Sequence, residues 1–259
     1  MLRVSGSATA SVRSGLKRKQ DRIDSLATFP ERVAAAKKAW KSKSSSKKLF
    51  ADVRELLSAQ SPGLRRCVYC EDSMADEIEH VHPKDWRPDL VFVFTNYVFA
   101  CGPCNGPKSN RYGIVVGAGV TEVQPTEPLI EPVGAPALLH PREVDPLDFL
   151  ELDLDSTFLY LPRLDLDALG KARAELTIDV LHLNDRETLT EGRREAFTTF
   201  RHRLEEAAEV RADGGDVEPL GASVRKLAHL TVFHEMRRQR EWFPKLRQLF
   251  DDVPEALAW

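Results

Sequence analysis

The sequence predicts an α+β, predominantly helical protein with a small zinc-held core between a basic helical N-terminal segment and a helical C-terminal region. Three observations lead to this prediction. Helix-forming stretches lie on both sides of the middle of the chain, and the middle alone combines two Cys-x-x-Cys pairs with a β-prone apolar run. Positive charge is concentrated before the first pair. We therefore expect three parts, residues 1–66, 67–113 and 114–259.

The composition is that of a globular protein. The chain has 259 residues, 42% of them apolar, which is enough for one sizeable core or two small ones. No uninterrupted apolar stretch approaches the ~18 residues that a membrane span needs. The first residues, "MLRVSGSATASVRSGLKRKQ", lack the apolar segment of a secretory signal. We expect a cytoplasmic protein with no membrane partner.

Charge is distributed unevenly along the chain. Residues 1–66 carry 16 Lys and Arg against 5 Asp and Glu, and the remaining residues carry 21 against 35. A concentrated positive segment suits a polyanion, and it equally suits the acidic half of the same molecule.

The N-terminal segment is expected to hold two or three helices over residues 12–60. "PERVAAAKKAW" is rich in helix formers. "KKLFADVRELLSAQ" places Leu49, Val53, Leu56 and Leu57 on one face at spacings of three and four. The "SPG" that follows is expected to stop this helix.

The rest of the chain changes texture several times. "LVFVFTNYVFAC" (90–101) reads as a strand. The Gly/Pro-rich residues from 114 to about 145 are expected to wind over the surface with little regular structure. "DFLELDLDSTFLYLPR" (148–163) partly alternates apolar and polar residues, which favours a short hairpin. Three further helices are expected over 165–183, 186–210 and 220–243.

All four cysteines stand in two Cys-x-x-Cys pairs, Cys67/Cys70 and Cys101/Cys104. Two such knuckles can form a tetrahedral thiolate cage for structural Zn²⁺, and disulfides are unlikely in a reducing cytosol. A redox Cys-x-x-Cys would stand near a βαβ pattern, which is not visible here. Unrelated buried thiols would not be confined to matched spacings. The long interval between the pairs predicts that zinc closes a loop that holds something else.

That loop resembles a known family. "E-H-x-x-P-K", then an asparagine ahead of "C-x-x-C-N-x-x-K", is similar to the HNH, or ββα-metal, endonucleases of the four-cysteine zinc subtype. The resemblance implies two strands and a helix around one divalent ion. By this match Glu79 and Asn105 are metal ligands, His80 is the general base, and Asn96 is the central asparagine that orients the loop bearing the histidine.

Phosphodiester hydrolysis needs these residue types. A neutral imidazole such as His80, with an ordinary pKa of about 6.5, can take a proton from the attacking water. Mg²⁺ or Mn²⁺ prefers oxygen ligands, which Glu79 and Asn105 supply, and the ion stabilises developing negative charge. Lys84 and Lys108 are candidate phosphate contacts.

Each candidate also has a plainer interpretation. His82 is a second metal ligand, a substrate contact or, more commonly, a surface histidine. Asn105 serves equally as a helix cap, and Lys84 and Lys108 equally as solvated lysines. Glu79 and His80 follow each other in a strand and reach one site only if the chain turns there.

The resemblance extends loosely to about residue 200. "ARAELTIDVLHLNDRETLTEGRREAF" is similar to the region after the HNH core in a bacterial subgroup that includes the HNH subunit of Septu-type anti-phage defence systems, encoded beside an ABC/SMC-like ATPase. It implies a nuclease that cuts DNA, with RNA left open as a substrate, and an ATPase partner. The alternative is a non-catalytic zinc-stabilised module that binds nucleic acid or protein.

Overall fold

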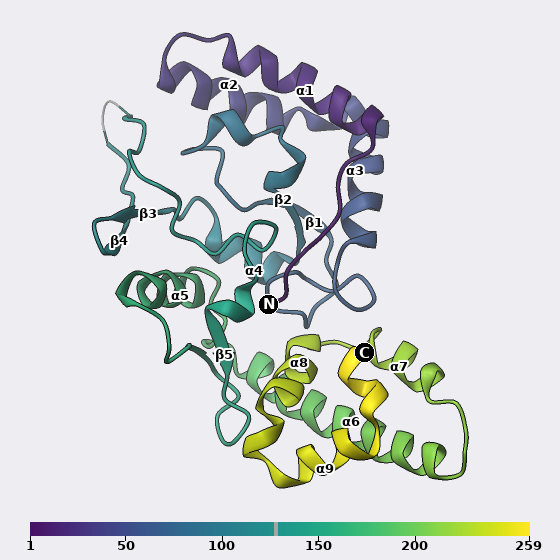
Figure 1. The fold of residues 1–259 in the computed structure, drawn as a ribbon. Helices are drawn as coiled ribbons and strands as arrows, with labels where there is room; N and C mark the ends of the chain where they lie inside the picture. The colour runs from purple at the N-terminus through teal and green to yellow at the C-terminus, as the bar shows by residue number, and fades with distance from the viewer. Residues whose placement is uncertain (127–128) are drawn as a thin grey trace.

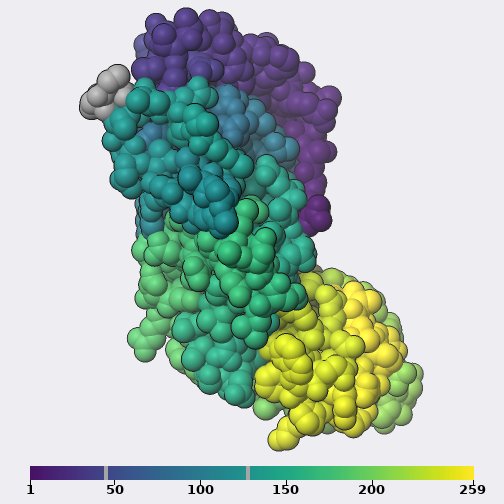
Figure 2. Space-filling model, turned by 60° about the vertical axis from the view of Figure 1, so that its left-hand side comes forward, coloured from purple at the N-terminus to yellow at the C-terminus, as the bar shows by residue number. Residues whose placement is uncertain are grey.

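The computed structural model describes residues 1–126 and 129–259, and at 44 and 45 the backbone alone. Helices occupy both ends of an elongated molecule, and short strands lie between them (Figures 1 and 2). The predicted class, predominantly helical α+β, is therefore confirmed. Among the described residues no helix is long and apolar enough to cross a membrane.

The N-terminal helices are α1 (Ala10–Asp24), α2 (Phe29–Lys41) and α3 (Lys47–Ala59), as predicted. The start of α2 is fixed by Thr28, whose hydroxyl accepts from the Glu31 amide while the Glu31 carboxylate accepts from the Thr28 amide. Helix α3 buries Val53 and Leu57 of the predicted stripe together with Phe50, and the other two stripe leucines lie at the margin of the same cluster.

The centre consists of β1 (Glu77–His80), antiparallel to β2 (Tyr97–Ala100), followed by α4 (Gly102–Lys108). The strand predicted over 90–101 is wrong for its first part, which forms a buried loop with 3₁₀ turns at 88–90 and 94–96. The Gln20 side chain of α1 binds this loop, accepting from the Phe92 amide and donating to the Pro88 carbonyl. These bonds replace ladder pairing, so the apolar run is buried without being a strand.

The expectation of little regular structure after 113 is also partly wrong. Strands β3 (Gly113–Val116) and β4 (Gly119–Glu122) form a hairpin, and its turn places Gly117 at φ +60°, a conformation that glycine adopts without strain. Residues 137–141 are buried rather than superficial. Positions 127–128 of this stretch fall outside the described residues. The predicted hairpin at 148–163 is confirmed by β5 (Leu150–Leu152) and β6 (Tyr160–Pro162).

The C-terminal region contains α5 (Ala168–Val180) and α6 (Glu187–Ala212), as predicted. The single helix predicted over 220–243 is wrong, because the chain breaks into α7 (Glu218–Val224) and α8 (Leu230–Gln239), with α9 (Pro244–Asp252) beyond. His229 at the break has φ +54°. Its amide donates to the Glu71 carbonyl and the Thr231 amide donates to the Glu71 carboxylate, so a tertiary contact overrides helix propensity.

Strand β2 lies between two apolar clusters. Its Tyr97 and Phe99 belong to the cluster formed with α1 and α3, whereas Val98 and Ala100 belong to the cluster that contains the cysteines and the C-terminal helices. A strand buried on both faces reads as a continuous apolar run instead of an alternating one. Packing on both faces of β2 therefore fixes the position of this strand and of β1, which pairs with it.

Candidate active site and cysteine cluster

The four cysteines converge in one buried cluster. Cys67 and Cys70 form a turn before β1, in which the Glu71 amide donates to the Cys67 carbonyl, and the Asn105 amide likewise donates to the Cys101 carbonyl at the start of α4. All four sulfurs lie within 4.8 Å of one another. Each knuckle therefore presents both of its thiols to the same point.

The cluster has the chemistry and spacing of a structural zinc site. Sulfurs bound at ~2.3 Å around tetrahedral zinc lie about 3.8 Å apart, and the Cys70 and Cys101 sulfurs are separated by 3.8 Å. At that separation no disulfide joins them, and all four thiols are free and buried. Arg186, next to α6, donates to the Cys104 sulfur at 3.1 Å, and its positive charge offsets part of the negative charge of four thiolates.

His80, at the end of β1, is held in one orientation. Its Nε2 lies 3.0 Å from the Val91 carbonyl oxygen, which also accepts from the Tyr97 hydroxyl. A carbonyl only accepts, so Nε2 carries the proton and Nδ1 of the neutral ring keeps its lone pair. Burial lowers the pKa of His80 to about 3, and the imidazole is therefore neutral at pH 7. The Trp40 ring from α2 packs edge-on against it at 4.3 Å between centroids.

Glu79, the preceding strand residue, is buried beside a lysine. Lys108 Nζ lies 2.6 Å from Glu79 Oε1 and donates to the His80 carbonyl at 2.9 Å. Burial raises the pKa of Glu79, and the charge of Lys108 opposes that shift. Lys108 has 0% of its side chain exposed, an internal position instead of the phosphate-facing one expected for it.

Glu79, His80 and Asn105 line one cleft of about 420 Å³. Asn105 stands in α4, and its Nδ2 donates to the Glu77 carboxylate, which leaves the amide oxygen for another partner. Lys84, expected as a phosphate contact, also lines this cleft and is half-buried. The close succession of Glu79 and His80 is no obstacle, because the chain leaves the strand at His80.

Asn96 fastens the loop that follows His80. Its Oδ1 accepts from the His82 amide at 2.8 Å, and its Nδ2 donates to the carbonyls of His82 at 3.0 Å and Leu90 at 3.1 Å. All three polar contacts of this buried amide are to backbone. His82 itself is 3% exposed, so its ring lies inside the protein and not on the surface.

Several residues at the cleft escaped sequence reasoning. Trp40 and Lys37 come from α2, and Lys43 Nζ lies 4.9 Å from the Trp40 ring centroid. Glu77 orients Asn105. These residues carry no local motif, because a helix distant in sequence brings Trp40 to the site. The basic character of residues 1–66 was the one available indication.

The sequence was compared with known proteins. No family model matches it. The chain is similar to Septu protein PtuB. The similarity is to PtuB of Bacillus thuringiensis, at 28% identity over 130 residues. It covers 48% of this chain and 38% of that PtuB, so the chain spans about two-fifths of the length of its curated relative.

Proposed function

We propose that the chain is a metal-dependent endonuclease of the HNH type and the nuclease component of a bacterial anti-phage defence system. The observation that carries this proposal is the convergence of Glu79, His80 and Asn105 on one cleft. The similarity to PtuB supports the assignment to a defence system. Zinc in the cysteine cluster is the scaffold in this proposal, and a different ion acts in the cleft.

His80 is the proposed general base. Its Nε2–H is occupied by the Val91 carbonyl, so Nδ1 is the atom that accepts the proton of an attacking water. Asn96 supports this role at one remove, since it holds the backbone of the loop that begins just after His80. Lys84 is the proposed phosphate contact from the wall of the cleft.

The oxygen atoms at the cleft suit a hard divalent ion. The Glu79 carboxylate and the Asn105 amide oxygen are donors of the kind that Mg²⁺ and Mn²⁺ bind. Such an ion supplies charge stabilisation for the phosphoryl oxygens and the leaving oxygen. Lys108 holds one oxygen of Glu79, which fixes the direction in which the carboxylate points. Glu77 fixes the Asn105 amide in the same way.

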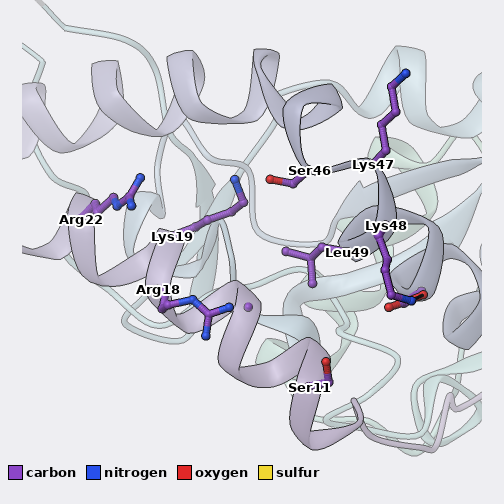
Figure 3. Close-up of a pocket in the computed structure, with 10 residues that line it drawn as sticks. Ser11, Arg18, Lys19, Arg22, Ser46, Lys47, Lys48 and Leu49 are labelled. Carbon is purple, nitrogen blue, oxygen red and sulfur yellow. Dashed lines mark hydrogen bonds and ion pairs between the residues drawn. The ribbon is translucent and has the colours of Figure 1, made fainter.

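A basic groove between α1 and α3 supports nucleic acid as the substrate. It measures about 630 Å³, and α1 contributes Arg18, Lys19 and Arg22 while the opposite wall contributes Lys47 and Lys48 (Figure 3). Asp52 is the acid in its lining and pairs with Lys48 at 3.5 Å. Such a concentration of cations fits a phosphate backbone.

One short turn connects a residue of the groove with a residue next to the cleft. Ser46 of the 3₁₀ turn Lys43–Ser46 lines the groove, and Lys43 at its other end lies over Trp40, which lines the cleft. We propose that DNA bound along the groove reaches the cleft past Lys43.

An ATPase subunit of the ABC/SMC type is the proposed partner, on the basis of the similarity to PtuB. Residues 165–259 carry 19 acidic against 15 basic residues, so the C-terminal helices lack the positive surplus of residues 1–66 and suit a protein contact better than a phosphate backbone. Co-purification with the product of a neighbouring ATPase gene would test this partner directly.

The central test is plasmid nicking with Mg²⁺ or Mn²⁺, with and without EDTA, in the presence of any co-purifying ATPase. We expect His80→Ala to abolish nicking, a loss of at least about 10²-fold, with the fold and the zinc content retained. His202→Ala, at an exposed position on α6, is the matched control and should nick at the parental rate. Equal nicking by both variants would remove His80 as the base and favour the non-catalytic binding module.

A further inference from the structure

A second group of possible metal ligands lies outside the cysteine cluster and the cleft. His82, in the loop after β1, and His140 and Glu143, in the turn before β5, each offer a ligand atom, and the three atoms lie within 4.8 Å of one another. The two imidazole rings are 5.0 Å apart between centroids. Residues nearly sixty positions apart in sequence therefore meet here.

The histidine rings are buried, with 3% of His82 and 2% of His140 exposed. His82 Nδ1 has no hydrogen-bond partner among the described residues. A buried polar atom left without a partner is destabilising by about 1–3 kcal/mol, and folded proteins retain such atoms where a ligand or function accounts for them. This nitrogen lies beside a second imidazole and a carboxylate, a donor set that transition metals accept.

We propose that His82, His140 and Glu143 bind a divalent transition-metal ion of the Zn²⁺ or Co²⁺ type. Two imidazoles and one carboxylate are a ligand set used for such ions, and they leave further coordination positions for water. Glu143 is exposed and gives the ion a route from solvent. Softer nitrogen ligands distinguish this site from the oxygen donors of Glu79 and Asn105.

Two features of the surroundings oppose binding. His140 Nδ1 accepts from the Arg142 amide at 3.2 Å, so coordination through Nε2 requires the other tautomer and the loss of this bond. A hydrogen bond of this kind contributes about 1 kcal/mol. The positive charges of Lys108 and Arg142 lie near the His140 ring, and they would repel a bound cation. Both features reduce affinity below that of the four-thiolate cluster, so the ion should exchange more readily than structural zinc.

The ion would join two parts of the chain. His82 is bound through its backbone to Asn96, and the turn that carries His140 leads to β5 and the C-terminal helices. Coordination would therefore stiffen the loop beside His80 and connect it to the apolar cluster that contains the cysteines and the C-terminal helices. This site does not depend on the proposed nuclease function, and either proposal can fail alone.

The test counts metal ions in the full-length chain after equilibration with Zn²⁺ or Co²⁺ and gel filtration. Glu143→Gln removes a ligand from an exposed position, and Glu175→Gln, also exposed, is the matched control. We expect Glu143→Gln and His140→Gln each to hold one equivalent less than the parent, with affinity for that ion weakened more than about tenfold. Ions in the cleft and the cysteine cluster are common to all variants, so the difference reports this site alone.

Spectroscopy on the Co²⁺-loaded protein gives a second measurement. A histidine and carboxylate site lacks the thiolate charge-transfer absorption that the cysteine cluster produces with Co²⁺. Glu143→Gln should remove weak ligand-field bands and leave the thiolate absorption unchanged. Identical metal content and identical spectra for the parent, Glu143→Gln and His140→Gln would overturn the proposal.

Discussion

Lys108 is an ammonium group held out of water between the Glu79 carboxylate and the His80 carbonyl. Burying a lone charge in a protein is strongly unfavourable, and a close counter-charge offsets much of that penalty. The pair therefore fixes α4 against β1 at the point where the candidate catalytic residues lie. Lys108 therefore positions the Glu79 carboxylate, and it has no contact with solvent.

Removing only one partner of this pair should be costly. We expect Lys108→Met to lower the free energy of unfolding by about 3–5 kcal/mol, because Glu79 is then left buried without a counter-charge. The double variant Lys108→Met/Glu79→Gln should recover a large part of that loss. Urea denaturation of the parent, the single variant and the double variant measures these differences. Lys84→Met, at a half-buried position, is the control and should change the free energy of unfolding by less than about 0.5 kcal/mol. A double variant no more stable than Lys108→Met would contradict the pairing.

At the scale of single residues, spacing and residue type predict part of the candidate site. They predict that Glu79, His80 and Asn105 lie close together and that the four cysteines form one cluster, because short turns and one strand pair fix each set. They did not place Lys108 or the His82 ring, because burial of a side chain is decided by distant neighbours. His140 and Glu143 carried no motif at all.

At the scale of elements, the largest error was at 220–243. Helices form on both sides of His229, as the pattern predicts. The break between them comes from Glu71, more than 150 residues earlier, which accepts hydrogen bonds from the amides of His229 and Thr231. Propensity cannot register a partner so distant. The loop at 90–96 failed for a related reason, since Gln20 supplies hydrogen bonds that a strand would otherwise need.

Gly63 joins the end of α3 to this same break. Its φ is +56°, and a Cβ atom there would overlap the Leu227 backbone carbonyl. Gly117 has φ +60° with open space around it. We expect Gly117→Ala to lose only about 1–2 kcal/mol of unfolding free energy, from the left-handed backbone. Gly63→Ala should lose at least ~1 kcal/mol more, because backbone must also move. Thermal or urea unfolding measures the difference, and equal losses would refute the close approach.

The groove between α1 and α3 makes a prediction about binding. Arg18→Glu/Arg22→Glu should weaken the affinity of the His80→Ala protein for a short DNA duplex by more than about tenfold, and the salt dependence of binding should decrease by roughly two released ions. Fluorescence anisotropy at several salt concentrations measures both quantities. Arg203→Glu/Arg211→Glu on α6 makes the same change of charge elsewhere, and an equal effect would show that only net charge matters.

At the scale of the whole molecule, the four cysteines lie within the apolar cluster that also contains the C-terminal helices. Structural zinc contributes an apparent ~10–16 kcal/mol to small metal-stabilised domains, which is comparable to the ~5–15 kcal/mol by which a typical protein is stable. We expect Cys101→Ser to lose zinc and most of its cooperative unfolding transition. Metal analysis and circular dichroism check this, and chelator-treated parent protein should behave alike. Normal zinc content and an unchanged melting temperature would exclude the scaffold role.

The first residues of the chain lie deep in this same cluster. The Val4 amide donates to the Pro141 carbonyl, and the fully buried Met1 contacts the hydroxyls of Tyr160 and Thr231. Tyr160 and Thr231 lie 159 and 230 positions along the sequence from Met1, so these contacts form only when very long loops close. We therefore expect this part of the interior to close late in folding, after the more local contacts have formed.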